Sequence, residues 1–303
     1  MIVAEGLTKR YGDKTAVDDV SFTVHPGRVT GFLGPNGAGK STTMRMIVGL
    51  DRPTAGQVTI AGTSYTSMRA PLTQVGILLD AKAAHKGRSA RTHLRAMAAT
   101  HGILRSRVDE VIEIAGLGSV ASKRVGGFSL GMGQRLGIAS ALLGDPHTLI
   151  LDEPVNGLDP EGVRWVREFV RHMASQGRGV LLSSHLMSEM SLTADHVIVL
   201  GRGRVLADAP IADLVHAWTT TTVTVRSPRL DDLASALAGP DVVVRSTMPG
   251  VAEITGLTQE SIGDTAADLG IPLHELRGAA GSLEDAYMAL TGDSVEYKSK
   301  ELS

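Results

Sequence analysis

The sequence contains no cysteine, which excludes disulfide bonds and cysteine-ligated metal sites and fits a reducing compartment. Its longest apolar runs, such as VIVL at 197–200, are far shorter than the ~20 residues of a membrane-spanning helix. The opening stretch MIVAEGLTKRYGDK lacks the basic region and apolar run of a secretory signal. We therefore expect a soluble chain, which does not exclude attachment to a membrane protein.

Charge is unevenly distributed along the chain. With 303 residues, of which 43% are hydrophobic, the chain is long enough for two packed domains. From His216 onward it has 6 Lys and Arg against 13 Asp and Glu, although the net charge of the whole chain is only −2. This shift predicts two domains, 1–215 and 216–303, and the acidic second domain disfavours nucleic acid as a partner.

Residues 1–215 alternate between apolar, strand-like segments and segments with helical spacing. This alternation is typical of an α/β domain with a parallel sheet, and the helical stretch at about 81–145 reads as an inserted subdomain. Ser89 is the expected N-cap of its first helix. The expected strands are MIVAEGL, VDDVSFTV, RVTGFLG, QVTIAG, QVGILLD, TLILDEP, GVLLSSH and HVIVLGRGRVLA, the last read as one strand, with helices at 41–48 and 161–175.

The pattern changes after residue 216. Strand-like and helical segments follow in the order β-α-β-β-α-β, and the helical segment SLEDAYMALTG comes last. This order is compatible with a small α+β domain of the ferredoxin-like kind.

A glycine-rich segment lies between the strand RVTGFLG and the helix that follows it. GPNGAGKS fits G-x-x-x-x-G-K-[ST], in which glycines let backbone N–H groups turn toward phosphates. Lys40 is placed to reach the β- and γ-phosphates, and Ser41 to ligate Mg²⁺. The alternative, a chance glycine turn, is disfavoured by the flanking strand and helix. The predicted nucleotide-binding residues, here called the phosphate loop, are Gly34, Pro35, Asn36, Gly37, Ala38, Gly39, Lys40, Ser41 and Thr42.

Two carboxylates end the apolar strand LILDE. Asp152 is placed to hold Mg²⁺ through water, and Glu153 to orient or deprotonate an attacking water. A solvated acidic turn before Pro154 is the alternative reading. The presence of the phosphate loop in the same chain favours the catalytic one.

These motifs and three others resemble the ATP-binding subunit of an ATP-binding-cassette (ABC) transporter. FSLGMGQR resembles that family's signature helix, VNGLDP its D-loop and LLSSH its histidine switch. The resemblance extends from Tyr11 to His185, with five motifs in the family's order. The segment after residue 216 resembles the extension of drug- and antibiotic-resistance exporter ATPases of the ABC-2 type.

The resemblance implies a role for each matching residue. Two cassettes would face head to tail with ATP between them, so that Ser129 and Gly131 contact the γ-phosphate bound by the partner subunit. A helix N-terminus with a small hydroxyl and bare amides can approach phosphate closely, although a purely structural helix start is the alternative. Asp159 would act across the dimer interface, while a helix N-cap before Pro160 is its simpler role.

Two aromatic positions are carried over in the same way. Tyr11 would stack on adenine, against the alternative of a tyrosine packed on its strand. His185 would contact the γ-phosphate and help to position the water, against the alternative of a histidine with no role in the site.

Three positions depart from the family pattern. Leu130 and Met132 stand where the signature has a glycine and a glutamine. Asp80 stands where the family has a glutamine after the strand; its carboxylate can approach Mg²⁺ but cannot donate as an amide does.

The resulting expectation is an ATP-hydrolysing subunit that powers an ABC exporter, with ATP and Mg²⁺ bound. Its partners would be a separate membrane permease and a second cassette, in a homodimer or a pseudo-dimer with a related chain. We expect it in the cytoplasm, peripheral on the inner face of the membrane. The alternatives are a non-transport ABC ATPase and a regulatory cassette that binds ATP with little hydrolysis.

Overall fold

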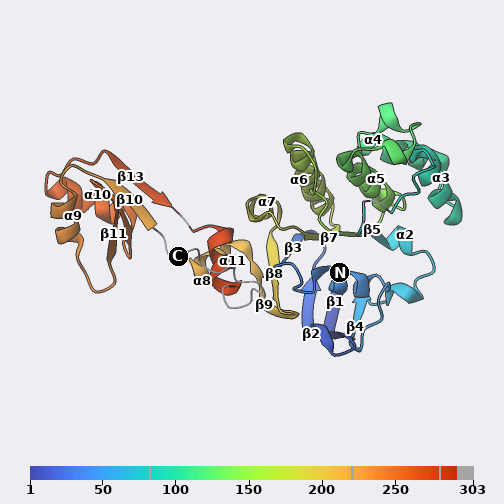
Figure 1. The fold of residues 1–303 in the computed structure, drawn as a ribbon, viewed down its shortest axis with the longest axis horizontal. Helices are drawn as coiled ribbons and strands as arrows, with labels where there is room; N and C mark the ends of the chain where they lie inside the picture. The colour runs from blue at the N-terminus through green and yellow to red at the C-terminus, as the bar shows by residue number, and fades with distance from the viewer. Residues whose placement is uncertain (82, 220–221, 280, 292–303) are drawn as a thin grey trace. The chain divides into compact units, whose positions relative to one another are not determined.

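The computed structural model describes residues 1–81, 83–219, 222–279 and 281–291 of the chain. These residues form two compact units: the first is Met1–Ile211 together with Thr291, and the second is Ala212–Leu290 (Figure 1). In the residues so described, no helix is both long and apolar enough to cross a membrane.

The first unit is built around a six-stranded sheet. Its strand order is β5-β6-β7-β3-β8-β9, and every neighbouring pair is parallel except β8 and β9. The predicted parallel α/β domain is confirmed. All residues of β3, β6 and β7 are buried, which explains their unbroken apolar runs. The strands are β3 (Val29–Leu33), β5 (Val75–Leu78), β6 (Thr148–Leu151), β7 (Gly179–Ser183), β8 (His196–Gly201) and β9 (Arg204–Pro210).

The prediction of one strand over HVIVLGRGRVLA is wrong, because β8 and β9 form an antiparallel hairpin. The two linking residues, Arg202 (φ 49°) and Gly203 (φ 80°), both lie in the left-handed region. Two such residues match the right-handed twist of the flanking strands and reverse the chain tightly. The hairpin turn also supports the phosphate loop, because the Gly203 N–H donates to the Ala38 carbonyl at 3.2 Å.

A second, antiparallel sheet with the order β2-β1-β4 belongs to the same unit. Its apolar side chains share one core with the six-stranded sheet and with α1 (Lys40–Ile47), and the rings of Phe22 and Phe32 lie 5.4 Å apart within it. This core fixes the strand and the helix that flank the phosphate loop. The strands are β1 (Ile2–Tyr11), β2 (Lys14–Val24) and β4 (Ala55–Ile60).

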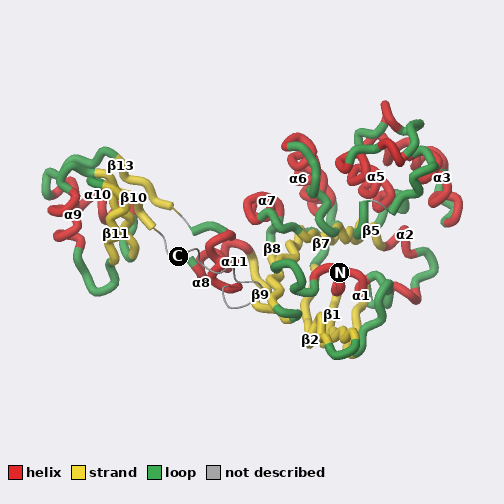
Figure 2. The backbone as a smooth tube through the Cα atoms, viewed as in Figure 1, coloured by secondary structure: helices red, strands yellow, loops and turns green. Residues whose placement is uncertain are grey.

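The helices α3, α4 and α5 gather beside β5 and correspond to the predicted helical insertion (Figures 1 and 2). The prediction that Ser89 caps α3 is confirmed, since its Oγ accepts from the Thr92 N–H at 3.1 Å. Glycine lets α5 lie against β5: a Cβ on Gly76 would stand 2.2 Å from the Ala141 carbonyl oxygen. The helices are α2 (Pro71–Gln74), α3 (Ala90–Thr100), α4 (Arg105–Ile114), α5 (Leu130–Leu142), α6 (Pro160–Ser175) and α7 (Met187–Thr193), with 3₁₀ turns at Tyr65–Ser67, Gly118–Val120 and Val125–Gly127.

The second unit contains a four-stranded antiparallel sheet with the order β11-β12-β10-β13. The helices α9 and α10 bury Leu233 and Ile262 against the inward residues Val223 and Ile254 of the sheet. The predicted β-α-β-β-α-β order followed by a helix is confirmed. The elements are α8 (Ile211–Trp218), β10 (Thr222–Arg226), α9 (Leu230–Leu237), β11 (Val243–Met248), β12 (Val251–Thr255), α10 (Gln259–Asp268), β13 (Glu275–Ala279) and α11 (Leu283–Thr291).

Candidate functional site

The phosphate loop joins the end of β3 to the start of α1. Gly37 and Gly39 have φ values of 84° and 101°, which side-chain-bearing residues rarely adopt. A Cβ on Gly39 would lie 2.7 Å from the Ala16 carbonyl oxygen, and one on Gly34 would lie 2.6 Å from that of Leu200. The glycines are therefore required by the backbone path and by close packing of the loop on its neighbours.

Lys40, the first residue of α1, is buried beneath this loop. Its Nζ donates to the carbonyl oxygens of Gly34 at 2.6 Å and Pro35 at 3.2 Å. Burial lowers the pKa of the Lys40 ammonium, whereas the negative charges of Glu153 and Asp152 act in the opposite direction. The side chain is thus held by backbone carbonyls at the loop, where a cation suits a phosphate-bearing ligand.

Asp152 lies just beyond β6 and is held by two hydroxyl groups. Ser41 Oγ donates to its Oδ2 at 2.8 Å, and Ser183 Oγ donates to its Oδ1 at 2.5 Å. The structure therefore brings together two of the three residues expected to hold Mg²⁺, Ser41 and Asp152. Ser183, fully buried at the end of β7, was missed by sequence reasoning. The sequence feature that could have indicated Ser183 is its position at the end of a predicted strand, two residues before His185.

Glu153 follows Asp152 with an unusual backbone. Its φ is 50°, and its N–H donates to Ser183 Oγ at 2.9 Å. Its Oε2 lies 2.7 Å from His185 Nδ1, within hydrogen-bond distance. The two predicted catalytic side chains, which are 32 residues apart in the sequence, are therefore in direct contact.

A cavity of about 480 Å³ opens over the phosphate loop, and both Asp152 and Glu153 line it. Tyr11 lines it too, with about half of its surface exposed. Its hydroxyl donates to Asp51 Oδ2 at 3.0 Å. Arg45 donates hydrogen bonds to the same carboxylate from two nitrogens, and this interaction lowers the pKa of Asp51. Lys9 Nζ lies over the Tyr11 ring, 4.9 Å from its centroid, so a cation already covers one face of the ring. The tyrosine hydroxyl is held by Asp51, which is in turn bound by Arg45, and sequence reasoning missed both of these residues.

Ser129 and Gly131 lie at the exposed N-terminal end of α5. Ser129 Oγ accepts from the Met132 N–H at 3.2 Å, which is an N-cap contact. Neither residue is among the described residues that line the cavity over the phosphate loop. The structure thus separates these residues from the phosphate loop of their own chain.

Asp159 caps α6, because its Oδ1 accepts from the Gly162 N–H at 2.9 Å while Pro160 occupies the first helical position. Its structural role is therefore filled, and its side chain remains on the exposed surface.

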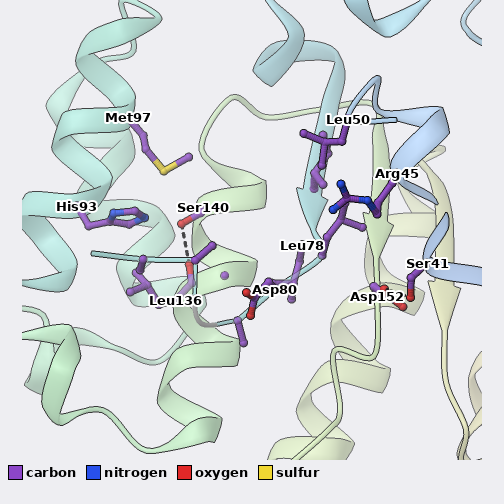
Figure 3. Close-up of a pocket in the computed structure, with 16 residues that line it drawn as sticks. Ser41, Arg45, Leu50, Leu78, Asp80, His93, Met97, Leu136, Ser140 and Asp152 are labelled. Carbon is purple, nitrogen blue, oxygen red and sulfur yellow. Dashed lines mark hydrogen bonds between the residues drawn. The ribbon is translucent and has the colours of Figure 1, made fainter. Parts of the chain in front are cut away.

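Asp80 follows β5 and lines a different cavity, of about 560 Å³, whose far end reaches Ser41 and Asp152 (Figure 3). Figure 3 draws its carboxylate apart from the Ser41–Asp152 pair. The structure therefore places Asp80 on a cavity that Ser41 and Asp152 also line.

The donor set suits Mg²⁺ bound together with a substrate. Ser41 Oγ and the Asp152 carboxylate are oxygen donors, which Mg²⁺ prefers, and this ion usually combines one or two protein ligands with substrate phosphates and water. Across the part of the chain that the structure describes, no group of three or more His, Asp and Glu could hold a metal by itself.

Comparisons with known proteins agree with this site. The family model "ABC transporter" matches residues 17–156, and a "Domain of unknown function (DUF8746)" matches residues 221–284. The uncharacterized ABC transporter ATP-binding protein YhcH of Bacillus subtilis is 36% identical over 304 residues, which cover 96% of each chain. The bacitracin transport ATP-binding protein BcrA of Bacillus licheniformis is 42% identical over 217 residues, 71% of each chain.

A solved structure described as the ATP binding subunit of an ABC transporter superposes with a TM-score of 0.66 at 28% identity. The match covers 72% of this chain and 92% of the other. A phosphate loop, a Ser41–Asp152 pair and a Glu153–His185 contact on a matching fold leave one conclusion. The chain belongs to the ATP-binding subunits of ABC transporters, and it is an ATPase.

Proposed function

We propose that this subunit hydrolyses Mg·ATP in a head-to-tail dimer and powers a separate membrane permease that exports its substrate. The observation that supports hydrolysis is the run of contacts from Ser41 through Asp152 and Ser183 to Glu153 and His185, beside the phosphate loop. Export is supported by the likeness to a bacitracin transport ATP-binding protein.

The chain's own side chains account for the phosphoryl transfer. The loop amides and Lys40 hold the phosphates, and Glu153 accepts hydrogen bonds from the water that attacks the γ-phosphorus. His185 holds the Glu153 carboxylate through Nδ1, which restricts its orientation. Ser41 and Asp152 would hold Mg²⁺, which would supply positive charge beside the phosphate oxygens.

The dimer is proposed because Ser129 and Gly131, at the N-terminus of α5, are not among the described residues that line the cavity over their own phosphate loop. Ser129 is exposed there, and the helix dipole and free amides of the first turn favour an anion. A second copy, turned head to tail, would present its γ-phosphate to this end of the helix. Each site would then be built from two chains. Asp159 would also act across the interface between them.

The test replaces Ser129 with arginine, and a matched control replaces Ser89. Both serines are N-caps whose Oγ accepts from the backbone N–H three residues later, at 3.2 Å for Ser129 and 3.1 Å for Ser89. Both variants therefore lose a cap of similar strength, about 1 kcal/mol. We expect Ser129→Arg to retain ATP binding by the monomer but to lose hydrolysis, while Ser89→Arg keeps both. Glu153→Gln should instead accumulate an ATP-bound dimer on size-exclusion chromatography, because the water is no longer activated.

Mixed dimers decide between a site built from two chains and a site built from one. Ser129→Arg and Lys40→Ala chains are each expected to be inactive alone. Mixed together, they form one intact site from the phosphate loop of the first and the α5 N-terminus of the second. Recovery of hydrolysis supports the head-to-tail dimer, whereas no recovery in dimers shown to be mixed contradicts it. Absence of Mg·ATP turnover by the unmodified chain would instead favour a regulatory cassette.

A further inference from the structure

Helix α5 is hydrogen-bonded to the segment that carries Glu153, the proposed catalytic residue. Gln134, one turn beyond Ser129, is only 5% exposed. Its Nε2 donates to the carbonyl oxygens of Glu153 at 3.1 Å and Asn156 at 3.4 Å. Its Oε1 is buried and has no hydrogen-bond partner among the described residues. Burying a side-chain amide whose oxygen has no hydrogen-bond partner costs free energy of folding. That glutamine stands here nevertheless favours a role for its bonds to residues 153 and 156 beyond packing.

The Glu153 peptide needs external support. A φ of 50° is uncommon for a residue with a side chain and persists only where the surroundings hold it. Side chains from two different elements do so: Ser183, at the end of β7, accepts from the Glu153 N–H, and Gln134 on α5 donates to the Glu153 carbonyl. The backbone that carries the Glu153 carboxylate is therefore held by hydrogen bonds at both its N–H and its carbonyl group.

The first turn of α5 packs on the same segment. Leu130, where the signature pattern has glycine, lies directly over Gly157: a Cβ on Gly157 would come 2.1 Å from Leu130 Cδ2. A Cβ on Gly131 would lie 3.1 Å from Leu158 Cδ2. Residues 153–158 are here called the 153–158 turn. The start of α5, residues 129–134, packs against this turn, and the two segments form one packed unit. It carries Ser129 at one end and Glu153 at the other.

We propose that Gln134 is a positioning residue for Glu153: its amide holds the Glu153 peptide in the conformation that presents the carboxylate to water. This inference rests on the proposed function. The contact lies within one chain, so it acts on the glutamate of the same chain in whichever site that glutamate serves.

The test compares Gln134→Met and Gln134→Glu with a control on the same helix. Methionine keeps the length without a donor, and glutamate places an acceptor against two carbonyl oxygens. Ser140→Ala is the control, because Ser140 Oγ donates only to Leu136 of its own helix (Figure 3). We expect both Gln134 variants to bind ATP as monomers with unchanged affinity and to keep their KM. Their kcat should fall about 10–100-fold, as when a group that orients a catalytic residue is removed.

A second measurement separates positioning from a general weakening of the fold. Introduced into Glu153→Gln, the Gln134→Met change should cause no further loss in single-turnover hydrolysis, because the group on which it acts is already gone. A multiplicative loss overturns the proposal, as does a parallel fall in ATP affinity. Failure of both Gln134 variants to fold also overturns it, because the amide would then serve the fold as a whole.

The two proposals fail differently. If mixed Ser129→Arg and Lys40→Ala dimers show no recovery, the head-to-tail dimer is wrong. If they recover while the Gln134 variants turn over like Ser140→Ala, the dimer stands and only the role of Gln134 is wrong.

Discussion

Ser183 offers the sharpest test of the site, because one buried hydroxyl serves both carboxylate residues. It donates to Asp152 Oδ1 at 2.5 Å and accepts from the Glu153 N–H at 2.9 Å. Its side chain is fully buried, so water cannot simply replace it. In Ser183→Ala the acceptor of the Glu153 N–H disappears, and the Asp152 carboxylate loses one of its two hydroxyl donors but keeps Ser41 Oγ.

The expected loss can be worked from these two bonds. A hydrogen bond to a charged group contributes about 1.5–3 kcal/mol and one between neutral groups about 1 kcal/mol. Ser183→Ala should therefore lower the free energy of unfolding by about 2–4 kcal/mol, a substantial part of the ~5–15 kcal/mol typical of a domain. Since Ser183 orients the groups that hold metal and water, kcat should fall about 10–100-fold.

The assay measures urea unfolding and steady-state ATP hydrolysis side by side. Ser184→Ala is the matched control, because Ser184 is as buried as its neighbour but its Oγ accepts from the Leu186 N–H. The control should keep turnover near that of the unmodified chain. Equal turnover in the two variants, with Ser183→Ala folded, would refute the role given to this hydroxyl.

Three further predictions address the loop, the 153–158 turn and the boundary between the units. Lys40→Ala should weaken ATP binding severely in a calorimetric titration, because it removes the cation and leaves two carbonyl oxygens facing the loop; unchanged affinity would contradict the phosphate-loop assignment. Gly157→Ala should lower the melting temperature, since its Cβ meets Leu130 and its φ is 74°; adding Leu130→Ala should restore part of the loss, and no restoration would show that the clash is unimportant. A chain shortened to residues 1–215 should fold and bind ATP, because it keeps the whole of Met1–Ile211, the continuous part of the first unit; an insoluble product would contradict that boundary.

The parts of the fold predicted correctly from sequence are those encoded by local patterns. Unbroken apolar runs predicted the buried parallel strands, and Ser89 predicted the start of α3, because a cap is defined by neighbouring residues. The hairpin of β8 and β9 was missed, although the Gly in GRG between two apolar runs was a usable signal.

The site was predictable as far as its residues belong to motifs. Lys40, Asp152 and Glu153 stand in contiguous patterns that carry their own chemistry. Ser183, Gln134 and Asp51 act through partners 30, 19 and 40 residues away. Their contacts exist only once the sheet and α5 are assembled, so no spacing in the sequence announces them.

The packing of Leu130 on Gly157 makes the two positions interdependent. A Cβ at 157 would stand 2.1 Å from Leu130 Cδ2, so a side chain at 157 requires the leucine side chain to move. The φ of 74° at Gly157 adds a backbone cost to the same change, whatever residue stands at 130. The effects of substitutions at 130 and 157 should therefore not add, and a variant of the signature segment has to be interpreted together with the residue at 157.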